Sequence, residues 1–325
     1  MKNKPFFLTY FLLLLTTVSL AQKKQNVYFL KNNGALVSLK DSADYIRVIQ
    51  EPDSGITYFN LLEYYPNGKK KRIGKLSSYD PNLILEESVV SYYPNGKKKD
   101  LAVYARGKLT GPHYYYYPNG QLKKSIIHVT PEKKTDKNVK PIIKMVSFYD
   151  STGVEMVKDG TGDYHETAEE NKLYEEGRYL NGFKDGVWKG KYLRSNHSFE
   201  EKYEMGEFIS GTALLNDGRL KAYRELEVMP GFKGGIEKFL EYVGRNYHFP
   251  REAIERGVSG RILVTFVVET NGMISNIKVV KDIGYGTGHA AIKVIEDSPK
   301  WIPGMQHGIP VRVSYTLPLM LKSNR

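Results

Sequence analysis

The chain has 325 residues, of which 41% are hydrophobic and 26% are charged, a composition typical of folded domains and not of a disordered chain. This length suggests about two buried cores, and the absence of cysteine excludes disulfides, thiolate metal sites and thiol nucleophiles. The formal net charge of +12 indicates a basic, solubilising surface.

The first 21 residues have the pattern of a signal peptide. Lys2 and Lys4 precede an apolar run over residues 6–20, and the small residues around Ala21 offer a cleavage site. The run is shorter than the roughly 20 apolar residues that a spanning helix needs. We therefore expect cleavage after Ala21 and export from the cytoplasm, so nucleic acid is not an expected partner. An uncleaved inner-membrane anchor is the alternative.

A short motif recurs three times in the first half of the chain. Its copies are Tyr-Pro-Asn-Gly segments that end at Gly68, Gly96 and Gly120. Proline fixes φ at the first corner of a turn, asparagine tolerates the second, and glycine takes the positive φ that closes a hairpin. Glycine pairs in residues 107–111 and 182–186 mark a second kind of turn. Each unit is therefore predicted to be a β-hairpin.

These hairpins resemble the MORN-variant repeats of many exported bacterial proteins. We assign residues 22–225 to an all-β hairpin-repeat region, in which residues 22–60 form an atypical first cap. Two polar stretches, residues 130–140 and residues 160–171, are expected to loop out of the stack.

Near residue 231 the pattern changes from hairpins to a mixture of helices and strands. Ile236, Phe239, Leu240 and Val243 lie at helical spacing, and a shorter helix is expected after Pro250. Strands are predicted over residues 262–269 and 273–281, then a helix near residues 290–295, then a last strand over residues 309–317. This order predicts a two-layer α+β domain, with helices packed on one face of a three-stranded antiparallel sheet.

Several residues of this region follow one another in a distinctive order and spacing. They include Gly234, Gly235, Pro250, Gly260, Gly272, Trp301, Pro303, Gly308 and Pro310. Over residues 228–322 this structural motif resembles TonB C-terminal domains. We therefore assign residues 228–325 to a domain of that family.

The resemblance implies a binding function and not an enzymatic one. TonB domains add a short extended segment of an outer-membrane receptor to their sheet as an extra strand. The partner is then a TonB-dependent outer-membrane receptor or a related envelope protein, and contact with the membrane is indirect. Edge strands could also pair two copies into a homodimer. The receiving edge would be the last strand, with the partner-binding residues Val311, Arg312, Val313, Ser314, Tyr315 and Thr316.

The N-terminal half departs from the pattern of energy-transducing TonB proteins. Its apolar run holds no histidine or acidic residue, and the repeat region stands where those proteins carry a proline-rich spacer. The leading interpretation is a periplasmic TonB-like binding protein linked to TonB-dependent outer-membrane transport. One alternative is an envelope structural or adaptor protein whose repeats bind the main partner. Another is an inner-membrane energy transducer with an uncleaved anchor.

No residue pattern indicates catalysis, a metal or a cofactor. The seven histidines are scattered without ligand spacing. The glycines at 284, 286 and 288 imitate a dinucleotide-binding loop, but the third glycine position of that fingerprint falls on His289. We therefore predict a protein that is not an enzyme, with no catalytic residue, no metal site and no cofactor.

Overall fold

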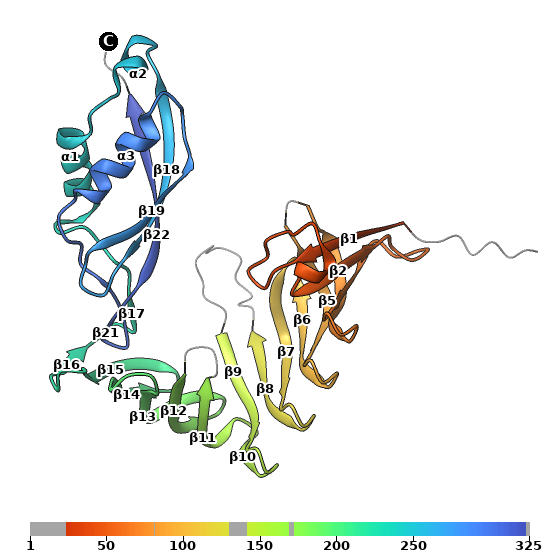
Figure 1. The fold of residues 1–325 in the computed structure, drawn as a ribbon. Coiled ribbons are helices and arrows are strands. Elements are labelled where there is room, and N and C mark those ends of the chain that lie inside the picture. The colour runs from red at the N-terminus through yellow and green to blue at the C-terminus, as the bar shows by residue number, and fades with distance from the viewer. Residues whose placement is uncertain (1–23, 81, 130–141, 169–171, 323–325) are drawn as a thin grey trace, which may run out of the picture. The chain divides into compact units, whose positions relative to one another are not determined.

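A computed structural model describes residues 24–80, 82–129, 142–168 and 172–322 of the chain. The expected signal peptide and the expected loop at residues 130–140 lie outside the described residues. The described residues form two compact units, one of residues 24–123 with 128–129 and the other of residues 124–127 with 142–322. Both units contain antiparallel strands, and the α-helices of the described residues belong to the second unit (Figure 1).

The first unit is an antiparallel sheet in which each strand pairs with the next one along the chain. Its elements are β1 (Gln25–Leu30), the 3-10 helix η1 (Lys40–Ser42), β2 (Tyr45–Gln50), β3 (Phe59–Tyr64), β4 (Lys70–Ser78), β5 (Ile84–Tyr92), β6 (Lys98–Ala105) and β7 (Lys108–Tyr116). Strand β8 (Leu122–Val129) contributes residues to both units. Ile49, Leu61 and Leu76 form the buried apolar centre of the first unit. The successive hairpins confirm the predicted all-β architecture.

The Tyr-Pro-Asn-Gly segments close hairpins of this unit. Gly68, Gly96 and Gly120 have φ angles of +79°, +90° and +92°, the conformation that glycine adopts without steric cost. Neighbouring turns are also bonded to each other, because the Tyr65 hydroxyl donates to the Tyr92 carbonyl at 2.8 Å. The motif therefore repeats because each copy both closes its own hairpin and contacts the next.

The second unit begins with further antiparallel strands. Its strands are β9 (Ile142–Tyr149), β10 (Glu155–Lys158), β11 (Thr161–Ala168), β12 (Leu173–Leu180), β13 (Phe183–Tyr192), β14 (Ser198–Glu204), β15 (Glu207–Leu214) and β16 (Leu220–Tyr223). Trp188 is only 1% exposed, and the rings of Tyr164 and Tyr179 contact it at centroid distances of 5.6 and 5.1 Å. These aromatic contacts form the core of the sheet.

The expectation that residues 160–171 loop out is wrong for residues 161–168, which form β11. Asp159 and Gly160 both have positive φ and make a tight turn into this strand. The strand is polar because most of its side chains are exposed or half-buried, whereas Tyr164 enters the core. Residues 169–171 lie outside the described part of the chain.

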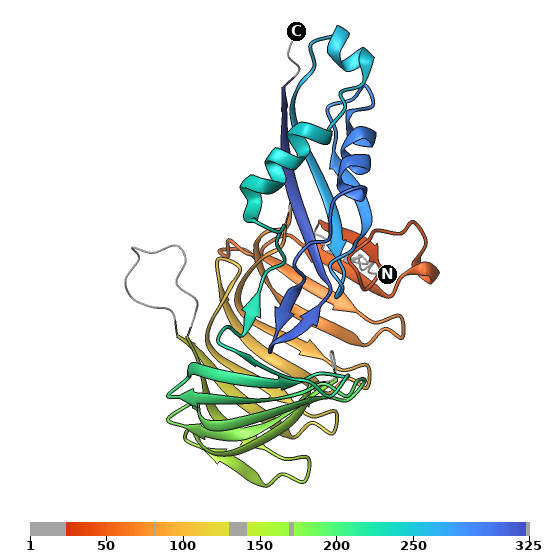
Figure 2. The same ribbon diagram turned by 90° about the vertical axis from the view of Figure 1, so that its left-hand side faces the viewer.

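The rest of the second unit is the C-terminal domain. Its elements are β17 (Glu227–Val228), α1 (Gly235–Asn246), α2 (Arg251–Glu255), β18 (Ser259–Val268), β19 (Ile274–Lys281), α3 (Thr287–Glu296), β20 (Gly304–Gln306), β21 (Ile309–Val311) and β22 (Val313–Lys322). One three-stranded antiparallel sheet has the order β19-β18-β22, and a smaller sheet has the order β17-β20-β21. Helices α1 and α3 cover one face of the larger sheet (Figures 1 and 2). This arrangement confirms the predicted α+β layer.

Two details of this domain differ from the sequence expectation. Phe239 and Val243 of α1 are buried, but Ile236 and Leu240 are each 50% exposed, so the helix rests on the sheet along a narrow stripe. The expected last strand over residues 309–317 is two strands, with Arg312 between them. The first of these turns back onto β20, whereas β22 pairs with β18 and continues to the end of the described residues.

Candidate functional site

Strand β22 is an edge of the larger sheet of the C-terminal domain. Strand β18 lies at the centre and pairs with β22 in unbroken register, from Val268 opposite Val313 to Ser259 opposite Lys322. Within the described residues no strand pairs with the other side of β22. A ten-residue strand therefore presents its outer backbone groups to a partner.

The side chains of β22 alternate cleanly between the two faces of the sheet. Leu317, Leu319 and Leu321 are buried under the helices, whereas the residues between them are exposed. This alternation fixes the register, because a slip by one residue would move every leucine to the open face.

Pro318 indicates which backbone groups of β22 point outward. It lies opposite Leu263 and has no N–H, so it fits a paired strand only where that position faces away from β18. Alternate residues of an antiparallel strand orient their backbone groups alike. The N–H and C=O groups of Ser314, Thr316 and Met320 therefore point away from β18.

Of the six residues predicted to bind a partner, four lie on β22: Val313, Ser314, Tyr315 and Thr316. Val311 ends β21, and Arg312 lies between the two strands. Arg312 donates two hydrogen bonds to Glu269, with Nε at 2.6 Å and Nη2 at 2.9 Å from its carboxylate oxygens. These two hydrogen bonds from Arg312, and a third from Ser275, hold the pKa of Glu269 below its ordinary value. The pair fixes the start of β22 against the end of β18.

The aromatic residue of the structural motif, Trp301, lies in the core behind this sheet. Its exposed fraction is 4%, and its ring contacts Phe239 and Phe266 edge-on at centroid distances of 5.2 Å. The backbone N–H of Trp301 donates to the carbonyl of Gly272 at 2.8 Å. A Cβ atom at Gly272 would lie 2.1 Å from the Trp301 carbonyl oxygen, so this close approach requires glycine.

The other motif residues shape the backbone around the sheet. Gly234, the N-cap of α1, and Gly235 have φ angles of +89° and +87°, and Pro250 is the N-cap of α2. Gly260 lies in β18 and Pro310 in β21. Pro303 precedes β20, and Gly308 lies in the turn that follows it.

The sequence did not predict the contact between the repeats and the C-terminal domain, which His307 makes with Phe199 and Glu201 and which we call the joint. His307, in the turn between β20 and β21, stacks on Phe199 of β14 with ring centroids 4.1 Å apart. Its Nδ1 lies 2.6 Å from a carboxylate oxygen of Glu201, and this carboxylate also accepts hydrogen bonds from the hydroxyls of Tyr203 and Tyr223. A Glu that is 1% exposed needs such partners, but nothing local in the sequence marks them.

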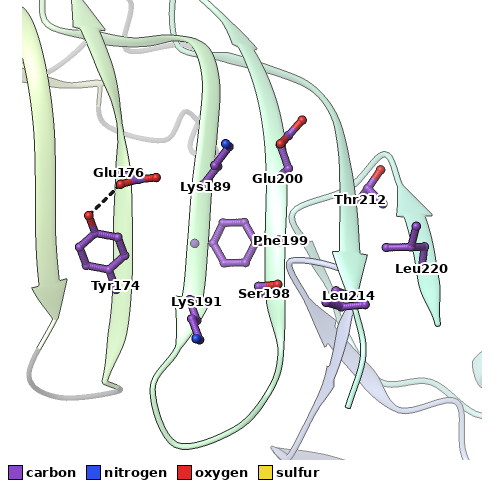
Figure 3. A pocket seen from close by; sticks show the side chains of 11 residues that line it. Tyr174, Glu176, Lys189, Lys191, Ser198, Phe199, Glu200, Thr212, Leu214 and Leu220 are labelled. Carbon is purple, nitrogen blue, oxygen red and sulfur yellow. Dashed lines mark hydrogen bonds between the residues drawn. The ribbon is translucent and has the colours of Figure 1, made fainter. Parts of the chain in front are cut away.

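The repeats of the second unit carry a hollow of about 650 Å³ (Figure 3). Across it, Glu176 lies opposite Lys189, which lies opposite Glu200 on the next strand. Tyr174 donates to Glu176 at 2.8 Å, and this hydrogen bond raises the tyrosine pKa. Lys191 also lines the hollow, so two acidic and two basic side chains balance there and the hollow does not select a ligand of one sign.

Among residues 24–80, 82–129, 142–168 and 172–322, no three metal-ligating side chains gather closely enough to hold an ion. In the same part of the chain, no helix has the length and apolar character needed to cross a bilayer.

The comparison with protein families agrees with the geometry of the C-terminal domain. Residues 245–321 match the family described as Gram-negative bacterial TonB protein C-terminal. No curated protein matches the chain. The matched residues include all of the β19-β18-β22 sheet except the last residue of β22. Residues 245–321 therefore form a C-terminal domain of the TonB family.

Proposed function

We propose that the protein is a non-enzymatic periplasmic binding protein, linked to TonB-dependent outer-membrane transport, that receives an extended segment on strand β22. The segment comes from a TonB-dependent outer-membrane receptor or a related envelope protein. The observation that carries the proposal is the unpaired outer side of β22, a regular ten-residue edge strand. Backbone hydrogen bonds to such an edge supply affinity in strand addition.

The geometry of the edge supports addition of a strand along most of its length. The outward groups of Ser314, Thr316, Pro318 and Met320 recur at every second residue, although Pro318 offers only a carbonyl, and an added strand presents its own groups at the same spacing. Packing of the alternating leucines under the helices keeps the edge straight and in register, so the site is formed before the partner arrives.

The other edge of the sheet, β19, provides an internal control. It carries Val280, which is 64% exposed, and its register with β18 shifts at two places. Such irregular edges pair less readily with another chain. We propose that β22 and not β19 takes the segment, and that a homodimer would have to compete for one of these edges.

Hydrogen exchange on the full chain tests the proposal. The probe is a synthetic peptide that copies the N-terminal segment of a TonB-dependent receptor from the same cell. Binding should slow exchange of the Ser314 and Thr316 amides, because they become hydrogen-bonded, and leave the β19 amides unchanged. Slowed exchange confined to β19, or to the repeats, would contradict the proposal.

An envelope adaptor whose repeats bind the main partner is a second candidate function. The hollow in Figure 3 favours it, since the exposed side chains of Leu214 and Leu220 add apolar surface to the charged row. Receptor peptide that protects residues of β12 to β15 in the same exchange experiment would favour this function instead.

The periplasmic location rests on the expected removal of residues 1–21. Mass measurement of the mature protein tests it, since cleavage after Ala21 leaves Gln22 as the first residue. An intact N-terminus starting at Met1 would instead favour the inner-membrane energy transducer.

A further inference from the structure

The open face of the β19-β18-β22 sheet has an unusual charge distribution. None of the three strands contains an aspartate or glutamate. Four cationic residues, Arg261, Lys278, Lys281 and Lys322, are exposed on them, and none makes an ion pair with another described residue. The nearest acids along the chain are engaged elsewhere, Glu269 with Arg312 and Asp282 with the start of α3.

These cations lie on the face that the helices leave uncovered. The buried residues of β18 and β22 alternate with the exposed ones. Arg261 lies opposite Met320, which is two residues before Lys322 on the same face of β22. Lys278 lies opposite Thr265, and Lys281 opposite Leu263. The open face is therefore cationic, with apolar surface between the charges from Met320, which is 74% exposed.

We infer that the segment received on β22 is acidic on the side that faces the open sheet, with its carboxylates toward the Met320–Lys322 end of the strand. This inference rests on the proposed strand addition at β22. An acidic extended peptide complements the charge of the face, whereas a neutral one leaves four exposed cations without partners.

Distance ranks the four cations. A strand added at β22 places its side chains about 5 Å from those of β22, about 10 Å from those of β18 and about 14 Å from those of β19. The Debye length is about 8 Å at physiological ionic strength. Lys322 should therefore contribute most, Arg261 less, and Lys278 and Lys281 least.

The test uses the full chain and two synthetic peptides of β-branched residues. In one peptide alternate positions carry glutamate, and in the other they carry glutamine. At about 0.1 M salt the acidic peptide should bind roughly tenfold more tightly, and at about 1 M salt, where the Debye length is about 3 Å, the difference should nearly vanish. The glutamine peptide should still bind, because strand addition itself uses the backbone.

Variants locate the charge effect. Lys322→Gln should weaken binding of the acidic peptide by roughly two- to fivefold without changing binding of the glutamine peptide. Arg261→Gln should have a smaller effect. Arg245→Gln is the matched control, since this exposed cation lies on α1, away from the sheet face, and it should change neither affinity.

Equal binding of the two peptides overturns the inference and leaves strand addition standing, whereas failure of both peptides to bind overturns both proposals. If Lys322→Gln and Arg245→Gln lose the same affinity for the acidic peptide, the effect comes from the net charge of the protein and the inference is overturned. If the protein binds anionic lipid vesicles and has the same affinity for both peptides, the cationic face would instead be a membrane-binding surface.

Discussion

The Nδ1 atom of His307 lies 2.6 Å from a carboxylate oxygen of Glu201, although 106 residues separate the two in the sequence. His307 belongs to the hairpin between β20 and β21, and Glu201 to repeat strand β14. The hairpin is also bonded through its backbone, because the His307 N–H donates to the Leu226 carbonyl at 2.8 Å. The C-terminal domain is thus fastened to the repeats beside it by packed side chains.

Replacing His307 should loosen this joint. The Glu201 side chain is fully buried, so His307→Ala leaves a buried carboxylate without its imidazole partner and removes the stack on Phe199. Breaking such a buried pair costs about 3 to 5 kcal/mol. Urea unfolding of the full chain would measure the loss. His289→Ala, at an exposed position of α3, is the control and should change little, whereas equal midpoints for both variants would contradict the role of the joint.

The same cluster predicts a dependence of stability on acid. Burial raises the pKa of Glu201, but hydrogen bonds and the charge of His307, with hydrogen bonds from Tyr223 and Tyr203, outweigh it, so the net pKa lies below the ordinary 4.5. A carboxyl whose pKa is lower in the folded state stabilises it above the unfolded pKa and loses this contribution as the pH falls through the folded pKa. Unfolding free energy should therefore fall below about pH 4.5. Glu201→Gln should remove that part of the slope, and an unchanged slope would show that other carboxyls account for it.

Trp301 should be the most costly single truncation in the C-terminal domain. Its ring fills the space between α1 and the sheet, in contact with Phe232, Phe239 and Phe266. Trp301→Ala should destabilise by about 3 to 5 kcal/mol, because the cavity cannot be filled by its rigid neighbours. Thermal unfolding of the full chain, followed by near-ultraviolet circular dichroism, would register the loss. An unchanged curve would mean that the ring does not hold the domain together.

Two glycines should respond to alanine in opposite directions. A Cβ at Gly190 would lie 2.0 Å from the Phe199 ring, so Gly190→Ala should destabilise the repeats by about 1 to 3 kcal/mol. Gly244 lies inside α1 with nothing near its Cβ position, so Gly244→Ala should stabilise by about 0.5 to 1 kcal/mol. Denaturant midpoints compare the two. Similar shifts in one direction would refute the packing of Phe199 on Gly190.

The sequence predicted those features whose causes are local. The Tyr-Pro-Asn-Gly turns need only the backbone preferences of Pro, Asn and Gly, so Gly68 and Gly96 marked hairpins without knowledge of the fold. Alternation of apolar residues also predicted a last strand that ends in Leu317, which is buried. In the C-terminal domain, helical spacing identified α1 but did not show that Ile236 and Leu240 would be exposed, since that depends on how the helix rests on the sheet.

Features that depend on distant partners were not predicted. The pairing of His307 with Glu201 joins residues from different domains, and each alone resembles an ordinary surface residue. The division of the last strand at Arg312 was not predicted either, because it arises from pairing: β21 pairs with β20, whereas β22 pairs with β18. Residues 161–168 were misassigned because their polarity reflects one exposed face and not the absence of a strand.

Titration of the receptor peptide into Ser314→Pro and Ser314→Ala tests the central claim most directly. The Ser314 N–H points away from β18, so proline leaves the internal ladder intact, as Pro318 does, but removes one donor for an added strand. With native circular dichroism established for both variants, calorimetry should show that Ser314→Pro weakens binding by up to about tenfold while Ser314→Ala binds like the wild type. Equal affinity for all three proteins would contradict strand addition at β22.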